Sequence, residues 1–283
     1  MKLQYLCSNE NDIATIKEKY QSDVTITQLN GTSTSIIEFN KNEDGEDAAK
    51  SLSDIDTYMK NAGFHLQLIE NDSSAFFNNE LYPLFNVFER DLRKVLYLAK
   101  AIGSNNNCNY KDIDTLEKKT FFEIYEILFI DNHFVSKCKS KFNSLGNSFS
   151  KEQFQKTFSF VMDYEEDINW SKLPLLDESA FTIKTNFKKL KDFRNDIMHA
   201  HNICFEKYCE AKDQIQKANK ELEILIQKYE SPISETDKEK FFKFDSIIVD
   251  TIVRLSNDFW DNPNFKISNS CSAGDMPAYY QSF

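Results

Sequence analysis

From Ala75 onward, apolar side chains recur every three or four residues, which is the spacing of one face of a helix. Only 6 glycines and 5 prolines occur among 283 residues, so long helices can form without interruption. The pattern predicts helices over residues 81–103, 114–130, 133–145, 150–161, 177–190, 202–229 and 236–260. The chain is therefore expected to be mainly α-helical.

Local signals mark several ends of these helices. Pro83 suits a first helical turn, because proline lacks the amide hydrogen that would be unpaired there. Ser150-Lys151-Glu152-Gln153 is a capping box, which predicts a helix start. Gly146 is expected to end the preceding helix, and Asp177 to begin a later one. The polar tail beyond Pro263 is expected to lie outside the helices.

The first 72 residues follow a different pattern, in which alternating β-branched residues are mixed with helical spacing. Strands are expected over residues 3–7, 24–27, 35–39 and 64–69, and helices over residues 11–20 and 47–61. Asn30-Gly31 marks a turn between the second and third strands, which is a hairpin signal. The resulting β-α-β-β-α-β order suits a small ferredoxin-like sandwich.

These two patterns divide the chain. Asn71-Asp72-Ser73-Ser74 reads as a linker between them. We expect a small α/β domain over residues 1–72, with a regulatory or partner-binding role, and a helical domain over residues 73–230. Residues 231–283 are expected to form a helix and tail that pack on the helical domain.

Composition limits the function classes. The hydrophobic share of 41% is enough for a packed core. A net charge of −11 gives no general attraction for nucleic acid, so any such contact needs a local basic patch. The 6 cysteines include no CxxC pair, which removes the usual zinc and redox spacings. No signal peptide or span of roughly 20 apolar residues is evident, so a cytoplasmic location without membrane contact is expected.

One stretch, residues 189–201, brings a guanidinium, an amide and an imidazole together. Arg194 and Asn195 are adjacent, and His199 follows five positions after the arginine. On a straight helix Arg194 and His199 would point roughly 140° apart. One copy of the chain would not easily close both on one phosphate, whereas a two-fold interface could. The spacing therefore favours a composite site in a homodimer.

These residue types suit metal-independent cleavage of RNA. The 2′-hydroxyl is a built-in nucleophile, and a histidine can move protons at neutral pH. A guanidinium clamps phosphate oxygens in two places. Asn195 would orient the histidine or donate to the phosphate. The preceding lysines, among them Lys188 and Lys191, would hold RNA, although a solvated helix face explains them equally well.

The stretch R-N-D-I-M-H-A resembles the R-x4-6-H signature of the HEPN superfamily, with its polar residue after the arginine. Phe88-Glu89-Arg90-Asp91-Leu92-Arg93 is similar to the E-x-x-L-R pattern near the start of many such domains. The resemblance covers roughly residues 75–230. It implies an HEPN-like helical bundle with Arg194, Asn195 and His199 as catalytic residues. Glu89 and Arg93 would be polar support.

The resemblance also implies a function. HEPN domains are commonly homodimeric and occur in prokaryotic toxin, abortive-infection and CRISPR-associated systems, where many are metal-independent endoribonucleases. It implies RNA as substrate, no cofactor or metal, and a possible antitoxin or activator protein. Members paired with a nucleotidyltransferase antitoxin often have tyrosine two residues after the histidine. His201 stands at that position here, which argues against modification by such a partner.

Other interpretations stay open. Arg194 and His199 would be structural if the arginine paired with an acid and the histidine capped carbonyls. The chain would then be a catalytically silent dimerisation or nucleotide-binding scaffold, or a protein-binding adaptor. His199 and His201 suggest a metal pair, but neighbours two apart on a helix do not face together. The acidic cluster of Asp163, Glu165, Glu166 and Asp167 is more typical of a solvated loop than of a Mg²⁺ site.

Overall fold

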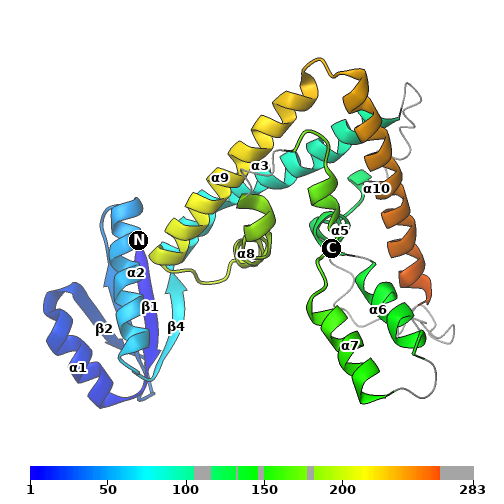
Figure 1. Cartoon of the computed structure of the whole chain (residues 1–283). Coiled ribbons are helices and arrows are strands. Elements are labelled where there is room, and N and C mark those ends of the chain that lie inside the picture. The colour runs from blue at the N-terminus through cyan, green and yellow to red at the C-terminus, as the bar shows by residue number, and fades with distance from the viewer. Residues whose placement is uncertain (105–115, 132, 146–149, 177–181, 262–283) are drawn as a thin grey trace, which may run out of the picture. The chain divides into compact units, whose positions relative to one another are not determined.

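The computed structural model describes residues 1–104, 116–131, 133–145, 150–176 and 182–261 (Figure 1). The chain divides into two compact units. Unit 1 contains Met1–Val95 and Asp177–Glu230, and unit 2 contains Leu96–Leu176 and Ser231–Phe283. The division passes through one long helix, between Val95 and Leu96.

Unit 1 begins with the β-α-β-β-α-β order predicted from the sequence, which is confirmed. The elements are β1 (Lys2–Cys7), α1 (Glu10–Tyr20), the 3-10 turn η1 (Gln21–Asp23), β2 (Val24–Gln28), β3 (Ser35–Asn40), α2 (Glu46–Asn61) and β4 (Leu66–Asn71). The strands lie in the order β2-β3-β1-β4, and every neighbouring pair is antiparallel. Two β-α-β units thus interlock, as in a ferredoxin-like sandwich.

The two helices cover one face of this sheet. Strand residues alternate between faces, so every second side chain of β1 points into the core. The core combines residues of the strands with residues of α1 and α2: Leu3, Tyr5, Cys7, Ile16, Ile37, Phe39, Leu52 and Met59. Tyr5 donates a hydrogen bond of 2.6 Å to the buried carboxylate of Asp56 in α2, which fixes that helix over the sheet.

Three further helices complete unit 1. They are α3 (Asp72–Gly103), of which the part up to Val95 belongs here, α8 (Thr182–Met198) and α9 (Phe205–Glu230). Helices α3 and α9 run side by side in Figure 1 and point the same way. The Phe77 and Tyr208 rings stack 4.6 Å apart near their starts, and Lys94 pairs with Glu230 at 2.6 Å further along.

The start of α3 differs from the prediction. Residues 71–74, predicted as a linker, form instead the last residue of β4 and the first turn of α3. The Asn71 side chain accepts hydrogen bonds from the Ser74 amide and the Ser73 hydroxyl, so these polar residues cap a helix. Pro83 is therefore in the helix interior and not in a first turn, which corrects that prediction.

Unit 2 contains one long helix, α10 (Glu235–Asp261), and several short ones. The others are α5 (Phe121–Phe129), α6 (Phe134–Asn143), α7 (Lys151–Met162) and the 3-10 turn η2 (Asn169–Lys172). The Trp170 ring is buried and stacks on Phe129 with centroids 5.0 Å apart. The buried Asn169 amide donates to the Ile127 carbonyl at 2.8 Å and to the Thr251 hydroxyl at 3.0 Å, which joins α5, η2 and α10.

Most predicted helices lie within a few residues of their observed positions. Ser150 forms the predicted capping box with Gln153, which confirms that start of α7. The N-cap of α5 is Thr120, which forms a capping box with Glu123. The starts predicted at Asp114 and Asp177, the stop at Gly146 and the tail beyond Pro263 lie outside the described residues.

Gly103 allows close packing between the end of α3 and α10. A Cβ atom added there would lie 2.6 Å from the Phe241 carbonyl oxygen and 2.9 Å from Asp245 Cβ. Alanine normally favours a helix by about 1 kcal/mol over glycine. A clash with backbone cannot be relieved by turning a side chain, so the clash outweighs this preference.

Gly103→Ala is therefore expected to lower the free energy of unfolding by about 1–3 kcal/mol, measured by urea unfolding. Ala101→Ser, at an exposed position in the same turn, is the control and should stay within about 0.5 kcal/mol of wild type. A Gly103→Ala protein as stable as this control would contradict the packing described for α3 and α10.

Candidate functional site

The Arg-Asn-x3-His stretch lies at the carboxyl end of α8, where the helix closes in a Schellman motif. The His201 amide donates to the Asp196 carbonyl at 2.8 Å, and the Ala200 amide donates to the Ile197 carbonyl at 3.1 Å. Ala200 has φ of 50°, in the left-handed region that usually requires glycine. His199 is therefore the C-cap residue of α8, and the helix does not continue beyond it.

Arg194 points toward α3 and contacts Glu89. Its Nη2 atom lies 3.4 Å from Glu89 Oε2, while Arg93 Nη2 donates to Glu89 Oε1 at 2.9 Å. The three side chains are 18–25% exposed, so they are only partly open to solvent. Two guanidiniums around one carboxylate leave a formal charge of +1. The structure thus brings predicted catalytic Arg194 together with both predicted supporting residues.

His199 has different surroundings. Its side chain is exposed, and its ring lies 5.8 Å from the His201 ring at an interplanar angle of 30°. Arg194 faces α3, whereas the His199 imidazole faces solvent beside a second imidazole. A second molecule has access to His199 without any rearrangement of α8.

His201 is held by an acid. Its Nδ1 atom lies 2.9 Å from Asp196 Oδ1, and the other Asp196 oxygen is paired with the Lys207 ammonium of α9. An ionised carboxylate only accepts hydrogen bonds, so Nδ1 of His201 must donate and Nε2 is left directed away from Asp196. Sequence reasoning did not assign Asp196, His201 or Lys207 to the site. The only sequence signal was an Asp five residues before a His across a helix end.

The loop between α8 and α9 is fixed to the first residues of α3 and to α2. The Ser74 hydroxyl accepts from the Ile203 amide at 2.9 Å and donates to the His201 carbonyl at 3.3 Å. Asn78 Nδ2 donates to the same carbonyl at 3.1 Å. In α2, the Ser53 hydroxyl accepts from the Phe205 amide, the first of α9, at 2.8 Å. Helices α2 and α3 therefore help to hold the histidine loop in place.

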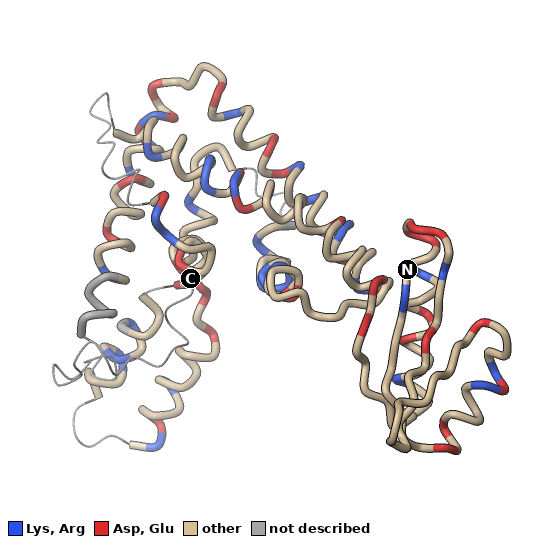
Figure 2. The backbone as a smooth tube through the Cα atoms, turned by 180° about the vertical axis from the view of Figure 1, so that it is seen from behind, with Lys and Arg blue, Asp and Glu red and all other residues tan. Residues whose placement is uncertain are grey.

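The predicted RNA-binding lysines lie on the same helix. Helix α8 carries five cations, Lys184, Lys188, Lys189, Lys191 and Arg194, against two acids, Asp192 and Asp196. Figure 2 shows that blue positions dominate this helix. Lys188 is exposed and Lys191 is partly buried, whereas Lys189 is paired with Glu210 of α9. Asn195 is partly buried, and its backbone carbonyl accepts from the His199 amide at 3.0 Å.

Neither a metal cluster nor a membrane span is seen in the described ranges. Among those residues, no group of three or more His, Cys, Asp or Glu is placed to hold a metal ion. In the same part of the chain, no helix has the length and apolar character to cross a membrane. No protein-family model, curated protein or solved structure matches the chain.

Ala200→Gly tests the helix end that carries the histidines. Glycine adopts φ of 50° without the penalty that a Cβ atom imposes, so the free energy of unfolding should rise by about 1 kcal/mol in urea. The control is Ala14→Gly, at an exposed position inside α1, where glycine should lower it by about 0.5–1 kcal/mol. Loss of stability in both variants would contradict the left-handed conformation at residue 200.

Asp196 gives a pH-dependent contribution to stability. Burial acts to raise the pKa of its carboxyl, but hydrogen bonds from Lys207 and His201 outweigh burial and hold the pKa below its ordinary value near 3.8. Ionised Asp196 therefore stabilises the fold above that ordinary value, and this contribution is lost as the pH falls through the native pKa.

Asp196→Asn should accordingly unfold at lower urea concentration than wild type at about pH 7, with the difference shrinking toward about pH 2. Asp192→Asn, at an exposed position on the same helix, is the matched control and should show little difference at either pH. A gap for Asp196→Asn that stays constant with pH would show that its ionised form is not preferentially stabilised.

Proposed function

We propose that the chain is a metal-independent endoribonuclease of a prokaryotic defence or toxin system, built on an HEPN-like helical domain and active as a homodimer. Arg194 pairs with an acid, as a structural arginine would, but that acid, Glu89, is shared with Arg93. The observation that carries the proposal is the positive charge that this sharing leaves next to a helix end that presents two imidazoles. Glu89 and Arg194 are 105 residues apart in the chain, yet both belong to the motif positions of the resemblance.

In this proposal Arg194 stabilises the charge that develops on the phosphoryl oxygens, with Arg93 keeping the local charge positive. His199 takes the proton of the 2′-hydroxyl or protonates the leaving 5′-oxygen, because it is exposed and can reach a bound strand. The 2′-oxygen bonds to phosphorus as the bond to the 5′-oxygen breaks. The products are a 2′,3′-cyclic phosphate and a 5′-hydroxyl end.

The two histidines have different roles: His199 moves protons, and His201 positions it. His201 is oriented by Asp196 and stacks beside His199, so it limits where the His199 ring can lie. Asn195 donates to the phosphate or orients an imidazole. The Arg194 and His199 side chains of one copy face different surroundings, which favours a site completed by a second copy across a two-fold axis. Lys188 and Lys191 would draw the RNA to α8.

Purified protein incubated with total RNA and tRNA in EDTA tests the proposal. Wild type should cleave, and the products should carry cyclic phosphate ends. Arg194→Ala and His199→Ala should each slow cleavage by about 100-fold or more, because each removes a group that acts in the transition state. Asp196→Asn should slow it less and change its pH dependence, since Asp196 acts through His201.

Two substitutions serve as matched controls. Arg90→Ala removes an exposed arginine of α3 beside Glu89, and His65→Ala removes an exposed histidine just before β4. Both should cleave like wild type. Cleavage that persists in Arg194→Ala and His199→Ala would overturn the assigned site. A wild-type protein that leaves RNA intact in EDTA and does not arrest growth when expressed would favour a silent scaffold instead.

A further inference from the structure

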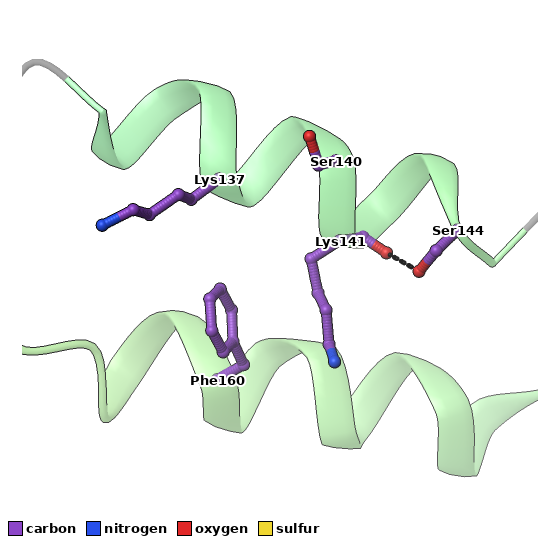
Figure 3. A pocket seen from close by; sticks show the side chains of 5 residues that line it. All are labelled: Lys137, Ser140, Lys141, Ser144 and Phe160. Carbon is purple, nitrogen blue, oxygen red and sulfur yellow. Dashed lines mark hydrogen bonds between the residues drawn. The ribbon is translucent and has the colours of Figure 1, made fainter.

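Helices α6 and α7 of unit 2 line an open pocket that uses none of the motif residues described above. Its volume is about 460 Å³, and its lining combines two ammoniums, two hydroxyls and one aromatic ring: Lys137, Ser140, Lys141, Ser144 and Phe160 (Figure 3). The lining has no carboxylate, although acids outnumber cations by 11 in the chain as a whole.

The positive charge of this pocket is local. Helix α6, Phe134–Asn143, carries Lys137, Lys139 and Lys141 and no acid. Lys137 is tied down, because its ammonium donates to the Tyr164 hydroxyl at 2.8 Å and lies 4.0 Å from Asp167. Among the described residues, no carboxylate lies within ion-pair distance of the Lys141 ammonium. Lys141 is therefore a cation without a neutralising acid in this part of the chain.

The aromatic ring sits between the two ammonium groups. Figure 3 shows the Phe160 ring projecting from α7 toward α6, with the Lys137 and Lys141 side chains on its two sides. The Lys141 ammonium is 5.5 Å from the ring centroid, and the Tyr164 ring meets Phe160 edge-on at 5.9 Å. Phe160 is only half-buried, so part of the ring is open to a ligand.

This combination selects for a particular chemistry. Ammonium groups bind phosphate oxygens, and an aromatic ring supplies a platform for a flat base. The Ser144 hydroxyl is already used, because it donates to the Lys141 carbonyl at 2.6 Å. A ligand that carries both a phosphate and a nucleobase uses both the ammonium and the ring, whereas an inorganic anion would leave the ring unused.

We propose that the pocket between α6 and α7 is a binding site for a nucleotide unit, either free or within a single strand of RNA. The base packs against the open part of the Phe160 ring, and the phosphate is bound by the Lys141 ammonium, which lies 5.5 Å from the ring centroid. The site does not depend on the proposed cleavage, because it uses none of the residues of α8.

Fluorescence anisotropy with a labelled 2′-O-methyl oligoadenylate tests the site. This probe lacks the 2′-hydroxyl nucleophile, so binding is measured even if the protein cleaves RNA. Lys141→Gln should weaken binding by about tenfold, the value of one lost charge-assisted contact. Lys139→Gln is the matched control, because it removes the same charge from the same helix outside the pocket.

A second pair of variants tests the ring. Phe160→Leu should weaken binding by about fivefold or more through lost stacking. Phe154→Leu, at an exposed phenylalanine of α7 outside the pocket, should leave binding unchanged. Lys141→Gln alters an exposed side chain, so its result stands even if Phe160→Leu disturbs folding.

Competition with ATP separates the two sources of the ligand. Displacement of the probe by low ATP concentrations supports a free nucleotide, and resistance to ATP supports an RNA strand. The proposal is overturned if neither the oligoadenylate probe nor ATP binds. Equal weakening by Lys141→Gln and Lys139→Gln also overturns it, because that result shows general attraction to α6. If the protein cleaves total RNA but binds nothing at this pocket, the proposed function stands and only the nucleotide site is rejected.

Discussion

The architecture of unit 1 depends on the buried hydroxyl of Ser74. This group accepts from the Ile203 amide and donates to the His201 carbonyl, so one side chain in the first turn of α3 satisfies two backbone groups of the α8–α9 loop. A buried backbone amide without a partner costs about 1–3 kcal/mol. The loop that carries the histidines is thus tied to the helix that also supplies Glu89 and Arg93. Ser53 of α2 adds a further hydrogen bond, which couples α2 to the start of α9.

The periodic parts of the fold could be predicted from the sequence, because burial of one face leaves a repeating pattern. All four strands and most helices lie where alternation or helical spacing placed them. The error at residues 71–74 arose because Asn, Asp and Ser favour both turns and helix caps, and only the hydrogen bonds of Asn71 decide between them. Pro83 was misplaced for the same reason. The polar residues that were predicted as a linker are the first turn of α3, so the helix begins well before the proline.

The candidate site was only partly predictable. The sequence indicated that Arg194, Asn195 and His199 belong together, and the resemblance added Glu89 and Arg93. The sequence could not reveal the contact between Arg194 and Glu89 at 3.4 Å, because this contact depends on how α3 and α8 pack. The pairing of Asp196 with His201 depends on Ala200, whose left-handed backbone turns the chain back over the helix end. No alanine signals that conformation in a sequence, because glycine is the residue expected there.

Charge is distributed unevenly in this acidic chain, and two helices hold the cations on which the two proposals depend. Helix α8 presents its cations beside the motif, and α6 presents three lysines without an acid. In both places the positive charge lies beside aromatic or imidazole rings. An acidic protein with such local basic sites can bind a phosphate-bearing ligand without attracting nucleic acid over its whole surface.

We propose that two copies of the chain complete one RNA-cleaving site, and mixing two inactive variants distinguishes this arrangement from a site within one copy. Arg194→Ala and His199→Ala proteins are combined, allowed to exchange subunits and assayed on RNA in EDTA. If Arg194 of one copy works with His199 of the other, half of the dimers are mixed and each has one intact site, so roughly a quarter of wild-type activity should return. A mixture as inactive as either variant, beside a wild-type protein that cleaves, would contradict the composite site.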